Sequence, residues 1–316
     1  MDQEFEGYEH DGAHEGAFEV DESFDEDGGE ASDGLDDELG VEGEEEEGAV
    51  TESAFDEDLG DEAGEGEDGV DPATEASLLA EAADYQVIGV DTRKRIRDTR
   101  VDPFRYLCKI SPPGCTGTLI APNKVLTAAH CVYNRTTKRR YRGSRVIPGK
   151  NGPSTSKTNE PFGFARAIRA DFPRAFATAR TYMDAWPHDF AVITLDRPIG
   201  RTVGWWKRIR AIPAAQLRRV RLNTAGYPGD KGGQHLYWTF NRVVSVRGRR
   251  VEYLHDTYGG QSGSPVWVRW KNNRSIVAIH VARDDAGRPG ATPIVANRGV
   301  AITPDVLATI RTWVSR

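Results

Sequence analysis

Lysine and arginine are absent from the first 86 residues. All 41 basic residues follow Gln86, whereas 35 of the 49 acidic residues precede Val87. The net charge of −8 therefore conceals a segment of charge −35 joined to a segment of charge +27. Residues 1–86 also have few large apolar side chains, so they cannot bury enough surface to offset the entropy lost on ordering. We predict a disordered acidic tail, in which only Thr74–Ala83 has the composition of a short helix.

Long apolar stretches and a recognisable export signal are also lacking. No run of about 18 apolar residues occurs in the sequence, which excludes a conventional membrane-spanning helix. Met1 is followed by acidic residues instead of a basic start and an apolar run, so the N-terminus predicts no signal peptide.

Cysteine is scarce, because the chain contains only Cys108, Cys115 and Cys131. The sequence has no Cys-x-x-Cys pair and no cluster of histidines, so we expect no metal and no cofactor. The odd number of cysteines is also compatible with a reduced, intracellular protein. Cys108 is expected to be a small buried side chain in a strand.

After Gln86 the sequence contains a pattern of short strands. The 230 residues from Val87 to Arg316 are enough for two small barrels, each with its own core. Runs of β-branched and aromatic residues alternate with Gly, Pro and Asn turns, and the long helices of a parallel α/β sheet are missing. The clearest predicted strands are Lys124–Leu126, Phe190–Leu195, Val243–Val246, Val266–Trp270 and Ser275–His280.

One helix is predicted, at Thr303–Val314. Pro304 suits its first turn, and Thr303 is expected to cap it. Its apolar face consists of Val306, Ile310 and Val314. Residues 134–187 are basic and rich in Gly, Pro and Ser, and we expect them to form surface loops that carry one or two strands.

The chemistry of the chain is indicated by the stretch from Tyr258 to Pro265, which reads Tyr-Gly-Gly-Gln-Ser-Gly-Ser-Pro and places Ser262 between small residues. Small neighbours let a substrate carbonyl reach the serine hydroxyl. They also let the backbone N–H groups of Gly260 and Ser262 point at the oxyanion that forms on attack. A serine hydroxyl is a weak nucleophile at neutral pH, so this interpretation requires a base and a group that orients the base.

Candidates for both groups lie upstream. His130 follows the run Val-Leu-Thr-Ala-Ala, and Asp189 opens a predicted strand, whereas Asp184, the nearby alternative, has no strand after it. Each segment alone has an ordinary structural explanation as a glycine turn, a packed histidine or a capping aspartate. Together they follow the order His, Asp, Ser, which is that of the chymotrypsin-like triad and not that of subtilisin or the α/β-hydrolases.

Longer stretches carry a family resemblance. The chain resembles the trypsin/chymotrypsin class in CTGTLIAPNKVLTAAHC at 115–131, HDFAVITLDRPIG at 188–200 and GGQSGSPVW at 259–267. Within that class it resembles the glutamyl endopeptidases, which cleave after Glu, in VIGVDTRKRIRDT at 87–99 and AGYPGDK at 225–231.

The resemblance covers residues 87–316 and implies a fold. It implies an all-β, chymotrypsin-like protein of two six-stranded antiparallel β-barrels, with a boundary near residues 200–210 and a C-terminal helix. It also implies a serine endopeptidase in which Ser262 attacks the peptide carbonyl, His130 accepts and returns the proton, and Asp189 orients His130.

Two further expectations concern maturation. The resemblance implies a disulfide between Cys115 and Cys131 beside the catalytic histidine. It also implies a secreted enzyme that is made as a precursor, with residues 1–86 as the propeptide, although the visible N-terminus does not show the usual export route.

Specificity for Glu, and secondarily Asp, rests on three positions. Glutamyl endopeptidases hold the substrate carboxylate with a histidine, a threonine five residues before the nucleophile, and the mature N-terminal amine, because a buried carboxylate needs compensating donors. The resemblance places these groups at His280, Thr257 and Val87. A histidine at a strand end is also an ordinary core residue. Asp256, six residues before Ser262, is an aspartate that the family carries without a preference for Lys or Arg.

The charge of +27 suggests a rival function. The basic stretches Lys138–Arg142 and Arg247–Arg250 could bind nucleic acid or another polyanion. No nucleic-acid-binding motif is present, and a binding role does not explain the ordered triad segments, so the main alternative is a chymotrypsin-like protease with another specificity. We expect a monomer that acts on protein substrates, with the acidic tail lying against its own basic domain.

Overall fold

The computed structural model describes residues 55–56, 87–88, 90–270, 273–283 and 296–316. The short helix predicted at Thr74–Ala83 and the disorder predicted for the acidic tail fall on residues outside these ranges. They therefore stay predictions.

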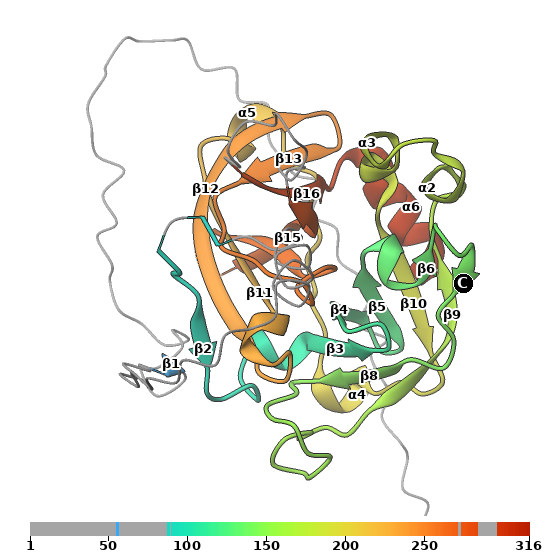
Figure 1. Ribbon diagram of the computed structural model, residues 1–316, viewed down its shortest axis with the longest axis vertical. Coiled ribbons are helices and arrows are strands. Elements are labelled where there is room, and N and C mark those ends of the chain that lie inside the picture. Colours follow the sequence, from blue (N-terminus) through green and yellow to red (C-terminus); the bar gives the residue numbers. More distant parts are fainter. Residues whose placement is uncertain (1–54, 57–86, 89, 271–272, 284–295) are drawn as a thin grey trace, which may run out of the picture.

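Six antiparallel strands close the first barrel, in the order β10-β5-β4-β3-β8-β9 (Figure 1). Nearly every residue of β4 and β5 is buried, and a Cβ on Gly117 of β4 would lie 2.7 Å from Val125 of β5. Glycine at this position therefore lets the two strands pack closely. The strands are β3 (Leu107–Ser111), β4 (Cys115–Ala121), β5 (Lys124–Thr127), β8 (Arg145–Pro148), β9 (Ala165–Asp171) and β10 (Ala191–Leu195).

The second barrel also closes through six antiparallel strands. β12 pairs with both β11 and β13, β11 pairs with β14, and the ring continues through β15 and β16 back to β13. The strands are β11 (Arg221–Gly226), β12 (Tyr237–Arg247), β13 (Arg250–Tyr253), β14 (Pro265–Trp270), β15 (Asn273–Arg283) and β16 (Asn297–Ala301). On the outer side of β12 lies β2 (Lys94–Ile96), which in turn pairs with β1 (Phe55–Asp56).

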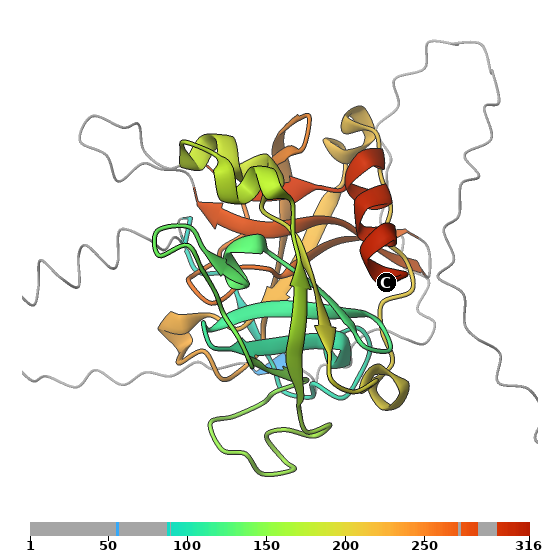
Figure 2. The same ribbon diagram turned by 90° about the vertical axis from the view of Figure 1, so that its right-hand side faces the viewer.

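Aromatic side chains join the barrels. The rings of Trp206, in the connecting chain, and Trp267, in β14, lie 5.3 Å apart between centroids. Phe190 packs against Trp313 of α6 at 5.5 Å, which holds α6 at the side of the molecule, outside both barrels (Figure 2). The helices are α2 (Arg174–Thr178), α3 (Tyr182–Ala185), α4 (Gly200–Val203), α5 (Ala214–Leu217) and α6 (Pro304–Val314). Within the described ranges, no helix has the length and apolar character needed to cross a membrane.

The predicted fold of two six-stranded antiparallel barrels with a C-terminal helix is confirmed. Four of the five predicted strands fall within observed ones, and the fifth, Phe190–Leu195, begins one residue before β10. Two details differ. Thr303 occupies the N-cap position of α6, but its hydroxyl binds the carboxylate of Asp305 and makes no capping bond to the backbone. Residues 134–187 contain more regular structure than expected: besides β8 and β9 they include a small hairpin, β6 (Tyr133–Asn134) with β7 (Arg139–Arg140), and the helices α2 and α3.

Candidate active site

His130 lies in a short 3-10 helix, Ala129–Cys131, directly after β5. The position of this helix is fixed by a disulfide between Cys131 and Cys115 of β4, which confirms the predicted pairing. The histidine side chain remains 34% exposed, so part of the ring is open to a substrate. The third cysteine, Cys108, is free and buried in β3.

Asp189 is positioned by the turn that precedes β10. Its backbone N–H donates to the carbonyl of Trp186, at 3.0 Å, and ends the 3-10 helix Trp186–His188. Trp186 is anchored in turn by the second barrel, because its indole N–H donates to the carbonyl of Gly299 at 3.0 Å. The aspartate is therefore held at the junction of the two barrels.

The carboxylate of Asp189 is completely buried and holds His130 at two points. Oδ2 lies 2.7 Å from Nδ1 of the ring, and Oδ1 accepts the backbone N–H of His130 at 2.9 Å. Asp184, the alternative candidate, is not in this position. Its carboxylate instead binds Thr181 at the start of α3, as a capping residue does.

Two opposing effects act on the pKa of His130. Burial of the ring lowers the pKa, whereas the charge of Asp189 and the hydrogen bond to it raise the pKa, and the net result is a value above 6.5. A proton accepted at Nε2 would therefore be stabilised by the carboxylate on the opposite side of the ring.

The loop that carries Ser262 is clamped from the first barrel. Thr116 of β4 donates its backbone N–H to the carbonyl of Ser262, and its hydroxyl donates to the carbonyl of Gly260, both at 2.8 Å. The Sγ atom of Cys131 lies 3.5 Å from the same serine carbonyl. These contacts place the serine loop directly beside the residue that follows His130.

Gly260 cannot be replaced without moving this loop. Its φ is +98°, and a Cβ on it would lie 2.4 Å from the carbonyl oxygen of Tyr227. Among the described residues, the backbone N–H groups of Gly260 and Ser262 have no hydrogen-bond acceptor, whereas the N–H between them, on Gln261, donates to Tyr258 at 3.0 Å. Two free N–H groups on one turn are what an oxyanion site requires.

The two serines of the loop differ in accessibility. Ser262 is half-buried, whereas Ser264 is completely buried, and its hydroxyl finds no hydrogen-bond partner in the described part of the chain. A substrate can therefore reach Ser262 but not Ser264.

His280, on β15, lies against the serine loop. Its carbonyl accepts the N–H of Gly263 at 2.7 Å, and its own N–H donates to Ser264 at 2.9 Å. Its ring is buried, and Nδ1 lies 2.8 Å from the hydroxyl of Tyr253. Burial, with smaller contributions from His255 and His130, lowers the pKa of His280 to about 3, so the ring is neutral at physiological pH.

The residues around Val87 meet the second barrel next to Thr257. Asp256 accepts the backbone N–H groups of Ile88 and Thr92, both at 2.8 Å, through its two carboxylate oxygens. Asp256 is only 1% exposed, so it is not available to a substrate Lys or Arg. Thr257 is buried as well, and its hydroxyl makes no hydrogen bond to residues that the structure describes.

Sequence reasoning missed two residues that shape this site, Tyr253 and Thr116. Tyr253, on β13, contacts His280, on β15, although 27 positions separate them in the sequence. Thr116 contacts the serine loop from the other barrel. Tyr253 lies outside the motifs described above. Thr116 stands in the stretch 115–131, but nothing local in that stretch indicates a contact with the serine loop. Both contacts depend on how the barrels are closed and packed.

A possible group of metal ligands also lies at this site. Cys115, His130 and Cys131 bring their ligand atoms within 4.8 Å of one another. The two sulfurs are joined in the disulfide, so neither can serve as a thiolate ligand while that bond is intact.

Comparisons with known proteins identify the family of the chain. The trypsin-like peptidase domain family matches residues 115–276, which include His130, Asp189 and Ser262. Glutamyl endopeptidase of Bacillus licheniformis is 31% identical over 234 residues, which are 72% of this chain and 68% of that protein. A protein of Bacillus subtilis named extracellular metalloprotease is 28% identical over 242 residues, 73% of this chain and 70% of that protein.

A solved structure shows the same similarity to a glutamyl endopeptidase. The structure of a Glu endopeptidase in complex with MPD matches with a TM-score of 0.61 and 32% identity, over 73% of this chain and all of the other. These similarities confirm the resemblance found in the sequence. The chain therefore belongs to the trypsin-like peptidase family and is a serine protease of the chymotrypsin fold.

Proposed function

We propose that Ser262, His130 and Asp189 form the catalytic triad of this serine protease. The observation that carries the proposal is the buried carboxylate of Asp189, which is bonded to both the ring and the backbone of His130. In this role His130 takes the proton of Ser262 and returns it to the leaving amine. The N–H groups of Gly260 and Ser262 hold the oxyanion meanwhile.

Replacement of the nucleophile tests this proposal. Ser262→Ala should lower kcat by about six orders of magnitude, as in the subtilisin triad. Ser264→Ala is the matched control and should leave most of the activity intact, because that hydroxyl is buried and unbonded within the described residues. Full activity of Ser262→Ala with loss in Ser264→Ala would identify the other serine as the nucleophile.

We further propose a preference for Glu, and secondarily Asp, before the scissile bond. The neutral ring of His280 and the buried hydroxyl of Thr257 can supply hydrogen bonds, but neither supplies a positive charge. The hydroxyl of Tyr253 has two neighbours, Nδ1 of His280 at 2.8 Å and the carbonyl of Arg298 at 3.1 Å. In the tautomer in which this hydroxyl donates its hydrogen bond to Nδ1, Nε2 carries the ring proton and can donate a hydrogen bond to a substrate carboxylate. A buried carboxylate also needs a compensating charge, and the amine of a new N-terminus at Val87 would provide it.

The contacts of Asp256 support this choice of N-terminus and argue against a trypsin-like specificity. The N–H of Ile88 is fixed 2.8 Å from Asp256, next to Thr257 in the sequence. A cut after Gln86 would therefore release an amine one residue from that anchor.

A panel of peptides that differ only in the residue before the scissile bond tests the preference for Glu. Equal cleavage after Glu, Leu and Lys by the mature protein would contradict it.

Under this proposal the full-length chain is a precursor. Removal of residues 1–86 would both free the amine of Val87 and remove a segment of charge −35 from a domain of charge +27. The cut after Gln86 does not suit a Glu-specific enzyme, so we propose that another protease makes it. The similarity to the extracellular metalloprotease of Bacillus subtilis supports an extracellular place of action.

A further inference from the structure

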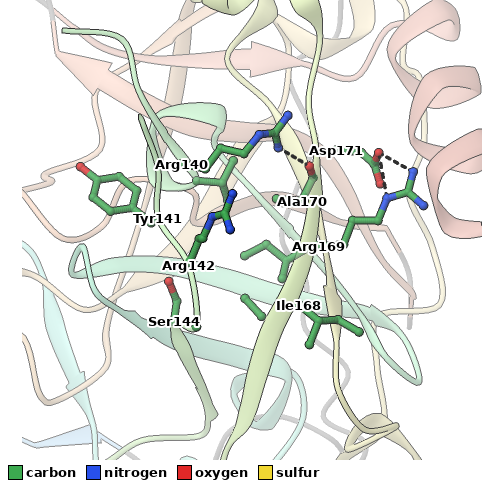
Figure 3. Close-up of a pocket in the computed structure, with 12 residues that line it drawn as sticks. Arg140, Tyr141, Arg142, Ser144, Ile168, Arg169, Ala170 and Asp171 are labelled. Carbon is green, nitrogen blue, oxygen red and sulfur yellow. Dashed lines mark hydrogen bonds and ion pairs between the residues drawn. The ribbon is translucent and has the colours of Figure 1, made fainter. Parts of the chain in front are cut away.

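The first barrel is closed between β8 and β9 by only a short stretch of pairing. These strands pair at only two positions, Arg145 with Arg166 and Val146 with Ala165. Beyond them the chain segment Arg140–Ser144 and the rest of β9 diverge and enclose a cavity of about 510 Å³ (Figure 3). Its lining includes Val132, which follows His130 by two residues in the sequence, but not His130 itself.

The wall formed by β9 is a free strand edge. β9 pairs with β10 on one side as far as Asp171, but no strand in the described ranges continues the ladder along 167–171 on the side of the cavity. Two backbone groups of this edge are already used, because the N–H of Ala167 donates to the carbonyl of Ser144 at 2.9 Å and the carbonyl of Ala170 accepts from Arg140 at 2.7 Å. The remaining groups of such an edge can bind an added extended peptide. One carboxylate oxygen of Asp171, Oδ2, is buried there without a hydrogen-bond partner in the described part of the chain.

Positive charge dominates the lining. Arg140 and Arg142 lie on one wall and Arg169 on the other, against a single carboxylate, that of Asp171 (Figure 3). Arg140 donates to the carbonyl of Ala170 at 2.7 Å, and Arg169 is paired with Asp171 at 2.8 Å. Arg142 is exposed and has no ion-pair or hydrogen-bond partner among the described residues. The cavity is therefore suited to an anionic ligand.

The cavity also has apolar surface. Val132 and Ile193 are buried in its lining, at 3% and 1% exposure, whereas Ile168 on β9 is 67% exposed. An exposed isoleucine on a free strand edge favours a ligand that carries apolar side chains as well as acidic ones. An inorganic anion or a uniformly acidic chain would leave this surface uncovered.

The tail contains a segment with both properties. Residues 18–21 read Phe-Glu-Val-Asp, and Glu22, Ser23 and Phe24 follow. In an extended strand, side chains alternate between faces, so Phe18 and Val20 would share one face and Glu19 and Asp21 the other. About 65 residues separate this segment from Val87. At about 3.3 Å per residue that length does not limit its reach.

We propose that the cavity between Arg140–Ser144 and β9 is a docking site for the acidic N-terminal segment of the same chain, with Phe18–Asp21 added as a strand along the free edge of β9. The acidic side chains meet the arginines, and the apolar ones cover Ile168. The consequence of docking for activity rests on the proposed function, because the docked segment would hold the tail on the barrel that carries His130. The docking itself does not depend on catalysis.

Hydrogen exchange of the full-length chain tests the site without measuring activity. All proteins carry Ser262→Ala so that the chain does not cut itself. With Phe18→Ser and Val20→Ser together, backbone exchange in residues 167–171 should become faster by about tenfold or more, because the added strand is lost. Phe5→Ser, an equally acidic tail position, is the matched control and should leave the exchange of this peptide unchanged.

A charge reversal gives an independent second measurement. Arg142→Glu should produce the same loss of protection, whereas Arg247→Glu, at the other basic stretch, should not. Exchange at 167–171 that is the same in every variant would overturn the proposal. Protection that rises with protein concentration would assign the edge to a second copy of the chain and would also overturn it.

Discussion

The two barrels each carry a histidine near the serine loop, and the pKa values of these two histidines are shifted in opposite directions. Both rings are desolvated, which lowers the pKa of each. His130 of the first barrel faces the buried carboxylate of Asp189, and its pKa rises above 6.5. His280 of the second barrel faces the neutral hydroxyl of Tyr253, and its pKa falls to about 3. The hydrogen-bond partner, and not burial alone, sets the charge that each ring can carry.

This difference matches two different tasks. A general base must gain a proton during the reaction, and a nearby carboxylate makes that gain favourable. A residue that recognises a substrate carboxylate can remain neutral, provided that a charge is supplied from elsewhere. In our proposal that charge is the amine of Val87, so the second barrel depends on the cleavage of the chain whereas the first does not.

Removal of the carboxylate from the first barrel should have the largest effect. We expect Asp189→Asn to lower kcat about 10⁴-fold, because the amide no longer holds the tautomer of His130 that can accept the serine proton. Steady-state kinetics on one peptide substrate measures this loss.

Asp184→Asn is the control for that measurement. Asp184 is five residues away and exposed, and it binds Thr181 rather than His130. We expect its kcat to stay near that of the unmodified protein. A similar loss in both variants would show that the effect arises from disturbance of the turn before β10 rather than from the triad.

The part of the site that the sequence predicts lies in contiguous motifs. The serine loop, the run before His130 and the strand after Asp189 each combine a reactive residue with a local pattern, and two cysteines flank the histidine. Strand positions were also predictable, because the apolar runs are short and bounded by turns. Thr303 was misassigned as a side-chain cap because the sequence does not show that Asp305 competes for its hydroxyl.

What the sequence could not predict depends on contacts between distant strands. The partner of His280 is Tyr253, which meets it only when β13, β15 and β16 close the second barrel. The role of Asp256 was equally hidden, because its carboxylate is occupied by backbone N–H groups from residues 88 and 92. Long-range pairings of this kind leave no local pattern.

Substitutions in the second barrel should change the specificity while leaving the proposed triad residues His130 and Asp189 unaltered. His280→Ala should reduce the preference for Glu over Leu before the scissile bond about 100-fold, and it should affect cleavage of other peptides much less. Tyr253→Phe keeps the ring but removes the hydroxyl that binds Nδ1, so it should shift the preference in the same direction by a smaller factor. Ratios of kcat/KM over a peptide panel measure both. A uniform loss for all peptides would contradict a role in specificity.

Salt should separate the two ways in which the tail affects the enzyme. In our proposal the tail would act at an effective concentration on the order of millimolar. We expect the full-length protein to be about tenfold less active than a protein that starts at Val87 at low ionic strength. Near 1 M salt the Debye length falls to about 3 Å, so shielding by the tail should fade while the missing amine should not. Equal activity of the two proteins at low salt would leave no regulatory role for residues 1–86.

The pH dependence should distinguish the two histidines directly. Only neutral His130 can accept the serine proton, so kcat/KM should fall as the pH drops through its raised pKa, with a midpoint above 6.5. In Asp189→Asn the carboxylate that raises this pKa is gone, and the midpoint of the residual activity should move to lower pH. His280 stays neutral down to about pH 3, so His280→Ala should leave the midpoint in place. A midpoint that moves in His280→Ala and stays fixed in Asp189→Asn would reverse the assignment of base and recognition residue.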